Sequence, residues 1–263
     1  MLGLIDPAVI GGTLAVVLFV GIIAALAAGR WIGKRTIARY GPSAAPALGS
    51  LETAVFALLG LMIAFTFSGA LSRFDTRRAQ IVDEANAMGT AYLRIDLVPA
   101  SAQPKLRETF RAYVDSRIET YRRLPDIAEA KAELEHTQAL QGEVWSQAIA
   151  AVRMPGSPPA AEWLVLNALN DMFNFTTIRT AATMMHPPVV IYAMLIGLAL
   201  ASALLAGYQT AGEKAYDWLH QLGFAGIVAL TVYVILDVEY PRLGFVRLDA
   251  IDQVIVSVRQ GMK

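Results

Sequence analysis

One stretch, residues 51–97, constrains the fold of this chain more than any other. Its first part, Thr53 to Ser72, is apolar and carries no formal charge over 20 residues. As a helix, this part is long enough to cross a bilayer core of about 30 Å. Charged residues follow, but no proline interrupts the stretch before Pro99, and apolar or small residues keep a heptad spacing that only Arg78 breaks. We therefore predict one long helix that leaves the membrane and becomes the spine of a water-exposed helical domain.

Composition supports membrane insertion and excludes several kinds of partner. The chain is 56% hydrophobic and only 17% charged, which is unusual for a soluble protein. Its net charge of zero offers no basic face for a phosphate backbone, so no nucleic-acid partner is expected. The chain has no cysteine, which excludes disulfides, thiolate catalysis and cysteine-ligated metals.

Three further segments have the length and apolarity of membrane spans. Residues 7–29 and 187–212 carry no charge, and residues 218–236 carry only His220 as an ionisable group. We predict an all-α, polytopic membrane protein with four transmembrane helices and a helical domain inserted between the second and third. The predicted parts are transmembrane helices 1 and 2 at 1–72, an extramembrane helical domain continuing from helix 2 at 73–186, transmembrane helices 3 and 4 at 187–236, and a polar tail packing on the helical domain at 237–263.

Within the predicted domain, prolines and polar residues mark the helix ends. Pro104 opens one helix, Asp126 is a candidate N-cap for the next, and the run Met-Pro-Gly-Ser-Pro-Pro at 154–159 is the clearest break in the chain. Further helices are expected from Ala160 toward Met185 and from about residue 249 to 259.

Connectivity places two groups of charges on the same side of the membrane. With four spans, the end of the second, the whole of residues 73–186 and the end of the fourth must share one face. We predict that charges from these ends pair at the membrane surface, where the dielectric is lower than in bulk water. The alternative is a set of solvated charges flanking two helix ends. The residues concerned are Arg73, Arg77, Arg78, Asp237, Glu239 and Arg242.

Basic residues give an argument for sidedness. Residues 30–39, after the first span, contain Arg30, Lys34, Arg35 and Arg39 and no acid. Because positive charge near spans favours the cytoplasm, this loop is expected there, with both termini and the helical domain outside. Arginines also flank the spans on the other face, so the bias is modest.

Several blocks resemble a bacterial membrane protein family described as bestrophin-like. These are LMIAFTFSG at 61–69, RFD at 73–75, EAN at 84–86, YLR at 92–94 and LDVEYPRLG at 236–244. The resemblance covers most of the chain and implies a multi-pass protein of the bacterial inner membrane. It extends more distantly to bestrophins, which are pentameric anion channels whose second span lines a hydrophobic neck. Their large helical region is cytoplasmic, which conflicts with the charge argument above.

If the channel analogy holds, spacing identifies a pore stripe on the second span. Five residues at steps of three and four are apolar in the membrane and hydroxylic toward its exit: Leu58, Leu61, Phe65, Ser68 and Ser72. Around a symmetry axis this face would form a hydrophobic constriction that gates by drying, with Arg73 and Arg77 below it attracting chloride or another inorganic anion. The alternative is ordinary helix packing, with Gly60 and Gly69 permitting close contact.

A second stripe is polar and precedes the third span. Amides and one hydroxyl repeat at a and d spacing among apolar residues: Asn167, Asn170, Asn174 and Thr177. Amides at such positions either specify helix register and partner number or line a wet vestibule. Either interpretation favours a homo-oligomer, a pentamer if the bestrophin analogy holds.

No enzyme chemistry is indicated. The three histidines lack metal-ligand spacing, no phosphate loop or nucleophile elbow occurs, and Asp237 and Glu239 are two apart and do not share a helix face. We expect no cofactor and no metal. Two functions remain: an oligomeric, anion-conducting channel, or a non-conducting membrane scaffold or sensor whose helical domain binds a partner or ligand.

Overall fold

The computed structural model describes residues 7–41, 49–213 and 218–263. The described residues are helical throughout apart from turns and connections, and none of them forms a strand. The helices are α1 (Pro7–Tyr40), α2 (Ser50–Arg94), α3 (Gln103–Arg122), α4 (Ile127–Val152), α5 (Pro159–Ala182), α6 (Val189–Gln209), α7 (Trp218–Glu239) and α8 (Asp249–Gln260), with short 3₁₀ turns η2 (Ile95–Leu97) and η3 (Thr210–Gly212).

The long helix predicted from residues 51–97 is confirmed. Helix α2 runs without interruption for 45 residues and continues into η2. The heptad positions of its second half, Ile81, Ala85, Met88 and Tyr92, are buried as the spacing required. A change from apolar to charged composition therefore occurs within one continuous helix rather than at a helix boundary.

Four described helices, α1, α2, α6 and α7, are long and apolar enough to cross a membrane. These are the four predicted spans. The chain divides into two compact units, which we call the apolar unit, with described residues from 7–73 and 186–240, and the polar unit, residues 74–185 and 241–263. Helix α2 contributes to both. Among the described residues, the divisions fall after residues 73, 185 and 240.

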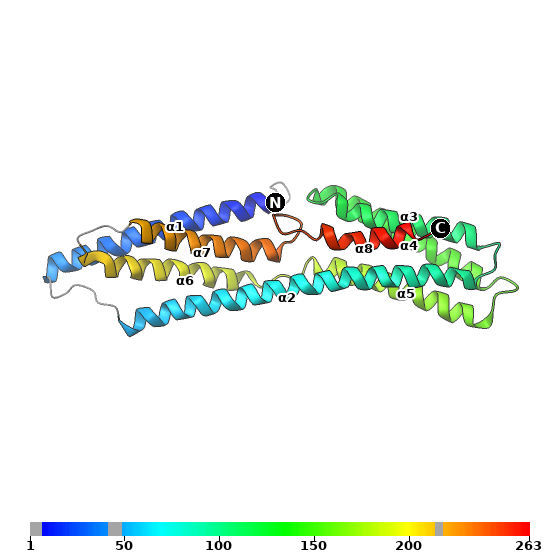
Figure 1. Ribbon diagram of the computed structural model, residues 1–263, viewed down its shortest axis with the longest axis horizontal. Helices are drawn as coiled ribbons and strands as arrows, with labels where there is room; N and C mark the ends of the chain where they lie inside the picture. The colour runs from blue at the N-terminus through cyan, green and yellow to red at the C-terminus, as the bar shows by residue number, and fades with distance from the viewer. Residues whose placement is uncertain (1–6, 42–48, 214–217) are drawn as a thin grey trace. The chain divides into compact units, whose positions relative to one another are not determined.

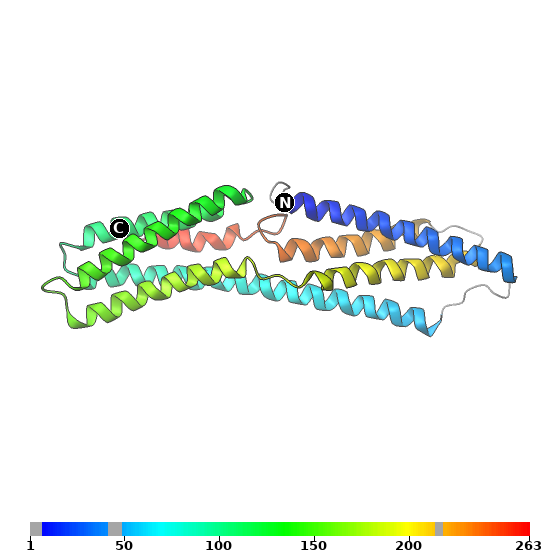
Figure 2. The same cartoon turned by 180° about the vertical axis from the view of Figure 1, so that it is seen from behind.

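In the apolar unit, α1 lies beside both α6 and α7 (Figures 1 and 2). The approach of α1 to α6 depends on glycine, because a Cβ at Gly29 would clash with the carbonyl oxygen of Leu204 and one at Gly207 with that of Leu26. Such close backbone contact is how membrane helices associate without a hydrophobic driving force. Helix α2 contacts α7 through Phe56 and Phe224, whose rings meet edge to face at 6.2 Å.

The polar unit has its own hydrophobic core, made by α2, α3, α4, α5 and α8. Its largest fully buried apolar side chains include Phe110 and Tyr113 of α3 and Met172 of α5. Helix α3 packs on α4 and on α8, so the C-terminal helix is part of this core. Asp126 caps α4 as predicted, since its carboxylate accepts a hydrogen bond from the backbone N–H of Glu129 at 2.9 Å.

Candidate functional site

The predicted pore stripe lies on a solvent-accessible face of α2. Leu58, Leu61 and Phe65 are 46%, 49% and 67% exposed, although they are large and apolar. The two serines that extend the stripe are exposed as well. Leu59 and Ala70, on the opposite side of the same helix, are buried at 4% and 0%. The fold of a single chain therefore leaves this face of α2 uncovered.

A cluster of polar side chains stands where the apolar stretch of α2 ends. Arg73 Nε lies 3.0 and 2.9 Å from the two carboxylate oxygens of Glu239, and Arg73 Nη2 lies 2.6 Å from Oε2. His186 Nδ1 lies 3.0 Å from Oε1 of the same carboxylate, and the His186 ring stacks on Tyr240 with 4.2 Å between centroids. The Glu239 side chain is fully buried, so its charge depends on these partners.

This cluster also coincides with three points where the described chain passes into or out of the apolar unit. The divisions follow Arg73, precede His186 and follow Tyr240. Each of these residues touches Glu239 or stacks on a residue that does. The Glu239 carboxylate thus joins the exit of α2, the approach to α6 and the end of α7. Contacts among Arg73, His186, Glu239 and Tyr240 therefore join these three segments within the apolar unit.

The other predicted charges have partners of their own. In the polar unit, Arg77 is buried and donates to the backbone carbonyls of Ala182 at 3.3 Å and Met185 at 3.2 Å, which caps the C-terminal end of α5. Arg78 is exposed and pairs with Asp75 at 3.3 Å, one turn away. The charges of Arg73 and Arg78 are therefore matched by carboxylates rather than left to attract an anion.

The backbone of Arg242 is in the left-handed region, with φ at 90°, a conformation that residues other than glycine rarely adopt. Asp252 holds it through a two-pronged ion pair, with Nη2 to Oδ1 at 2.9 Å, and the guanidinium carbon lies 4.7 Å from the Tyr121 ring centre. Asp237 is buried near the end of α7 in the apolar unit. Of the six predicted charges, the structure brings Arg73 and Glu239 into direct contact.

The predicted polar stripe lies on the exposed side of α5. Asn167, Asn170, Asn174 and Thr177 are all exposed in the single chain. The last three line an open groove of about 750 Å³ between α4 and α5. Helix α4 contributes Gln138, Gln141 and Trp145 to the same groove, and the described residues that line it are all uncharged. The groove therefore offers hydrogen-bond donors, acceptors and an aromatic ring to a neutral surface.

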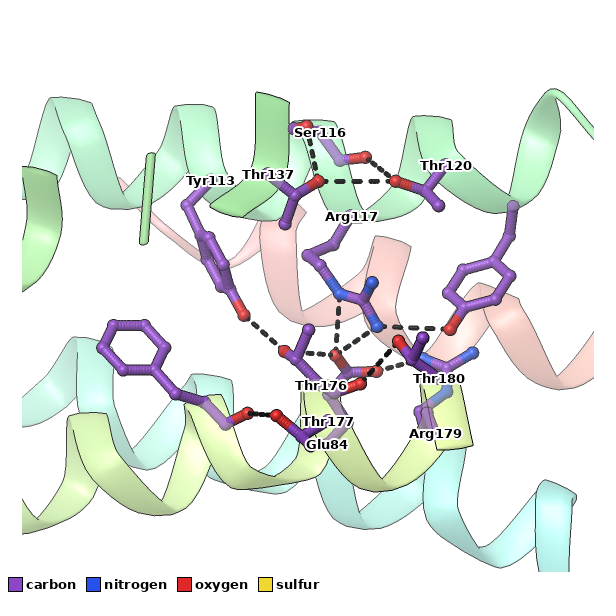
Figure 3. A network of polar contacts seen from close by, with 12 residues as sticks. Glu84, Tyr113, Ser116, Arg117, Thr120, Thr137, Thr176, Thr177, Arg179 and Thr180 are labelled. Atoms are coloured by element: carbon purple, nitrogen blue, oxygen red, sulfur yellow. Dashed lines mark hydrogen bonds and ion pairs between the residues drawn. The ribbon is translucent and has the colours of Figure 1, made fainter. Parts of the chain in front are cut away.

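A buried ionic network in the polar unit was not predicted (Figure 3). Glu84 of α2 accepts from Arg117 of α3, with Oε1 2.9 Å from Nε and 2.8 Å from Nη2, and its Oε2 pairs with Arg179 of α5. Thr176 donates to Oε1 at 3.3 Å and bonds the Tyr113 hydroxyl at 2.7 Å. All of these side chains are buried. One carboxylate thereby sets the positions of three helices.

The electrostatics of this network favour the ionised carboxylate. Burial by itself would raise the pKa of Glu84, but the guanidinium groups of Arg117 and Arg179 outweigh burial and lower that pKa. Burial would also lower the pKa of Arg117, and the surrounding Tyr121 and Glu84 raise it instead, so this guanidinium stays charged. An ionised carboxylate held between two guanidinium groups in this way positions the helices that carry them.

The sequence did contain a signal for this network. Glu84 stands three residues after Ile81 and four before Met88, on the face of α2 that is otherwise apolar. Arg117 follows Tyr113 by four residues on the buried face of α3. A charged residue at an apolar helical position indicates a buried partner, but the pattern does not say which one. Among the residues that the structure describes, no group of three or more potential ligands could hold a metal ion.

Comparisons with known proteins identify relatives at the level of family and fold. The family profile described as Bestrophin-like domain matches residues 15–250. The chain is also similar to a crystal structure of a bacterial bestrophin homologue from Klebsiella pneumoniae that carries a tryptophan-to-alanine mutation, with a TM-score of 0.68 and 13% sequence identity. That match covers 93% of this chain and 95% of the other. A comparison with curated proteins found no match.

Proposed function

The chain belongs to the bestrophin-like family, and from this premise we propose that it is an oligomeric membrane ion channel that conducts anions, with α2 lining a hydrophobic neck. The exposed stripe of α2 carries this proposal. Contact with lipid would cover the apolar side chains of Leu58, Leu61 and Phe65 as well as a pore would. Lipid contact does not explain why the hydroxyls of Ser68 and Ser72 lie on the same face of the helix. A water-filled axis accounts for both halves of the stripe.

A pore lined by α2 requires more than one copy of the chain. One helix cannot enclose a pore, so several copies must place the same face of α2 around an axis, and homo-oligomers with closed symmetry are the usual solution. We propose a homo-oligomer, with five subunits by analogy with bestrophins. The uncharged groove between α4 and α5 supports this arrangement, because amides such as Asn170 and Asn174 can hydrogen-bond a neighbouring copy without the cost of burying charge.

Anions, with chloride as the example, are proposed as the conducted ions. One common kind of cation-selective pore uses rings of carboxylates, and α2 has no acid between Glu52 and Asp75. The proposal does not rely on Arg73, whose charge is balanced by Glu239. A hydrophobic neck of this kind would gate by drying, so its radius and polarity would control conduction.

The experiment is chloride flux from liposomes containing the purified chain. We expect wild-type protein to release chloride and Phe65→Ala to increase the rate, since the smaller side chain widens the neck. Phe67→Ala is the matched control: it changes the same residue type on the same helix, about 200° around it, and should leave flux unchanged. Absence of flux under every polarity and pH, or equal effects of both variants, would contradict the proposal.

A second function has a specific observation in its favour. The groove between α4 and α5 fits a neutral polar partner as well as a neighbouring copy, which is what a non-conducting scaffold or sensor would need. Substitution of Asn174 by Leu separates the alternatives. Loss of the oligomer on size-exclusion chromatography supports the channel assembly, whereas an intact oligomer without flux supports the scaffold.

We further propose the bacterial inner membrane as the location, with the polar unit on the extracytoplasmic side. The basic segment at the C-terminal end of α1, residues 30–39, supports this orientation. Because the chain has no cysteine, a single exposed one introduced by Ser146→Cys in α4 reports sidedness directly. Labelling of intact spheroplasts by a membrane-impermeant maleimide is the expected result, and labelling only after lysis would reverse the orientation.

A further inference from the structure

The last three turns of α1 carry a concentration of positive charge that the proposed channel does not use. Between Asp6 and Glu52 the sequence contains no acidic residue. Arg30, at the start of these turns, is buried and donates from Nη2 to the backbone carbonyl of Glu213 at 3.2 Å, so it has a structural role. The remaining basic residues of these turns are exposed: Lys34, Arg35 and Arg39.

The length of α1 sets the depth of these residues in a bilayer. The uncharged part of the helix, residues 7–29, spans about 34 Å at 1.5 Å per residue, which matches a hydrocarbon core of about 30 Å. The headgroup layer adds about 5–8 Å on each side. Lys34 and Arg35 lie about 6–8 Å beyond Arg30 along the axis and so reach the depth of the lipid phosphates. Arg39 lies about 14 Å beyond it, in the water just outside this layer.

These cations are not neutralised by the described part of the chain. Among the described residues, Lys34, Arg35 and Arg39 make no ion pair with an acidic side chain. The described acidic residues at this end of the apolar unit are Glu213, whose backbone carbonyl binds Arg30, and Glu52, whose carboxylate accepts a hydrogen bond from Gly49 N at 2.9 Å. Within the polar unit, by contrast, most arginines have a carboxylate partner.

Aromatic rings at the same end hold the cations at the interface. The guanidinium carbon of Arg35 lies 3.6 Å from the centre of the Trp31 ring, and Trp31 is 54% exposed. Arg39 lies 5.6 Å from the Tyr40 ring, and Tyr40 is also exposed. Tryptophan and tyrosine concentrate at headgroup depth because their rings are amphipathic. A guanidinium stacked on a ring keeps its N–H groups at the edge, in the planar arrangement that suits a phosphate.

From these observations we propose that the last three turns of α1 form a binding surface for anionic phospholipid headgroups. Lys34 and Arg35 contact the lipid phosphates, Arg39 adds longer-range attraction, and Trp31 anchors the helix at the interface. The surface is independent of conduction, so its test neither supports nor weakens the proposed channel.

The test uses the full chain purified in a neutral detergent. Phosphatidylglycerol and phosphatidylcholine with the same acyl chains are titrated separately, and bound lipid is counted by native mass spectrometry. We expect phosphatidylglycerol to bind about ten- to a hundredfold more tightly, from the usual contribution of each basic residue at a charged membrane surface. Lys34→Gln, Arg35→Gln and Arg39→Gln combined should remove most of this preference, and 0.5 M salt should weaken it.

Two variants control for fold and for net charge. A charge-preserving combination, Lys34→Arg, Arg35→Lys and Arg39→Lys, should keep most of the preference. Three exposed basic residues of the polar unit supply a matched control that removes the same charge elsewhere and should bind like wild type: Lys105→Gln, Lys131→Gln and Arg153→Gln.

Three outcomes would overturn the proposal. The first is equal binding of both lipids by wild type, and the second is full retention of the preference by the glutamine variant. The third is displacement of phosphatidylglycerol by millimolar inorganic phosphate, which would identify a soluble-anion site in place of a lipid surface.

Discussion

Replacement of Glu84 by glutamine tests how the polar unit is held together. The change keeps the shape of the side chain but removes the charge shared by Arg117 and Arg179. The new amide group would also place N–H donors against a guanidinium that has only donors. Arg117 is 1% exposed and would lose its carboxylate, whereas Arg179 keeps Asp252 at 3.6 Å. Because breaking a buried pair leaves an uncompensated charge, we expect Glu84→Gln to lower the free energy of unfolding by about 3–5 kcal/mol.

The assay is chemical unfolding followed by the fluorescence of Trp145, which packs edge to face on Phe173 in the polar unit at 6.3 Å. The chain has four tryptophans, so the other three are first replaced by phenylalanine. Glu119→Gln is the control. It removes a partly exposed partner of Arg123 on the same unit and should cost less than about 1 kcal/mol.

If Glu84→Gln lowers the free energy of unfolding by less than about 1 kcal/mol, the reasoning is refuted, because a buried charge that loses its partner should destabilise the fold by more than this. Simultaneous replacement of Glu84, Arg117 and Arg179 by methionine provides the complementary result. It removes the charges together with their desolvation cost, so stability should return close to that of wild type.

Three further predictions follow from contacts within one unit. Arg117 and Arg179 outweigh burial and lower the pKa of Glu84. The ionised Glu84 therefore stabilises the fold above the ordinary glutamate pKa, roughly 4.3, and this stabilisation is lost as pH falls through the lowered pKa. Unfolding measurements on the polar unit at decreasing pH should show this loss of stability in wild type and not in Glu84→Gln. Glu239→Gln weakens the two-pronged ion pair with the partly exposed Arg73. Thermal unfolding should show that the free energy of unfolding falls by about 1.5–3 kcal/mol. An unchanged unfolding midpoint would show that the segments joined by Glu239 do not need its carboxylate. Gly207→Ala places a methyl group against the backbone of α1 and should destabilise the apolar unit by about 1–3 kcal/mol, whereas Gly197→Ala, which meets nothing within 4 Å, should be neutral in the same unfolding assay.

The fold was largely predictable because its signals are local. Uncharged runs longer than 18 residues identify membrane-length helices without knowledge of their neighbours. The heptad positions from Ile81 to Tyr92 likewise predicted which face of α2 is buried. The Asp126 cap and the break at 154–159 depend on a few adjacent residues and were predicted for the same reason.

The candidate sites were less predictable because they depend on pairs distant in sequence. Charge pattern grouped Arg73 with Glu239, 166 residues apart, but gave the same prediction for Arg77, which instead caps α5 through Ala182 and Met185. Sequence spacing offers no means of telling a carboxylate partner from a backbone carbonyl. The role of His186 was missed because a lone histidine carries no spacing signal.

By itself, the sequence determined the number of membrane-length helices, the continuity of α2 and which of its faces is apolar, since these follow from hydrophobicity and helical period along a single stretch. Tertiary structure alone decided which charges meet. The contacts of Glu84 with Arg117 and Arg179, and of Glu239 with Arg73 and His186, exist because separate helices bring these groups within hydrogen-bond distance. The physical reason is that burial makes a charge dependent on its partner, and that partner is chosen by packing in three dimensions.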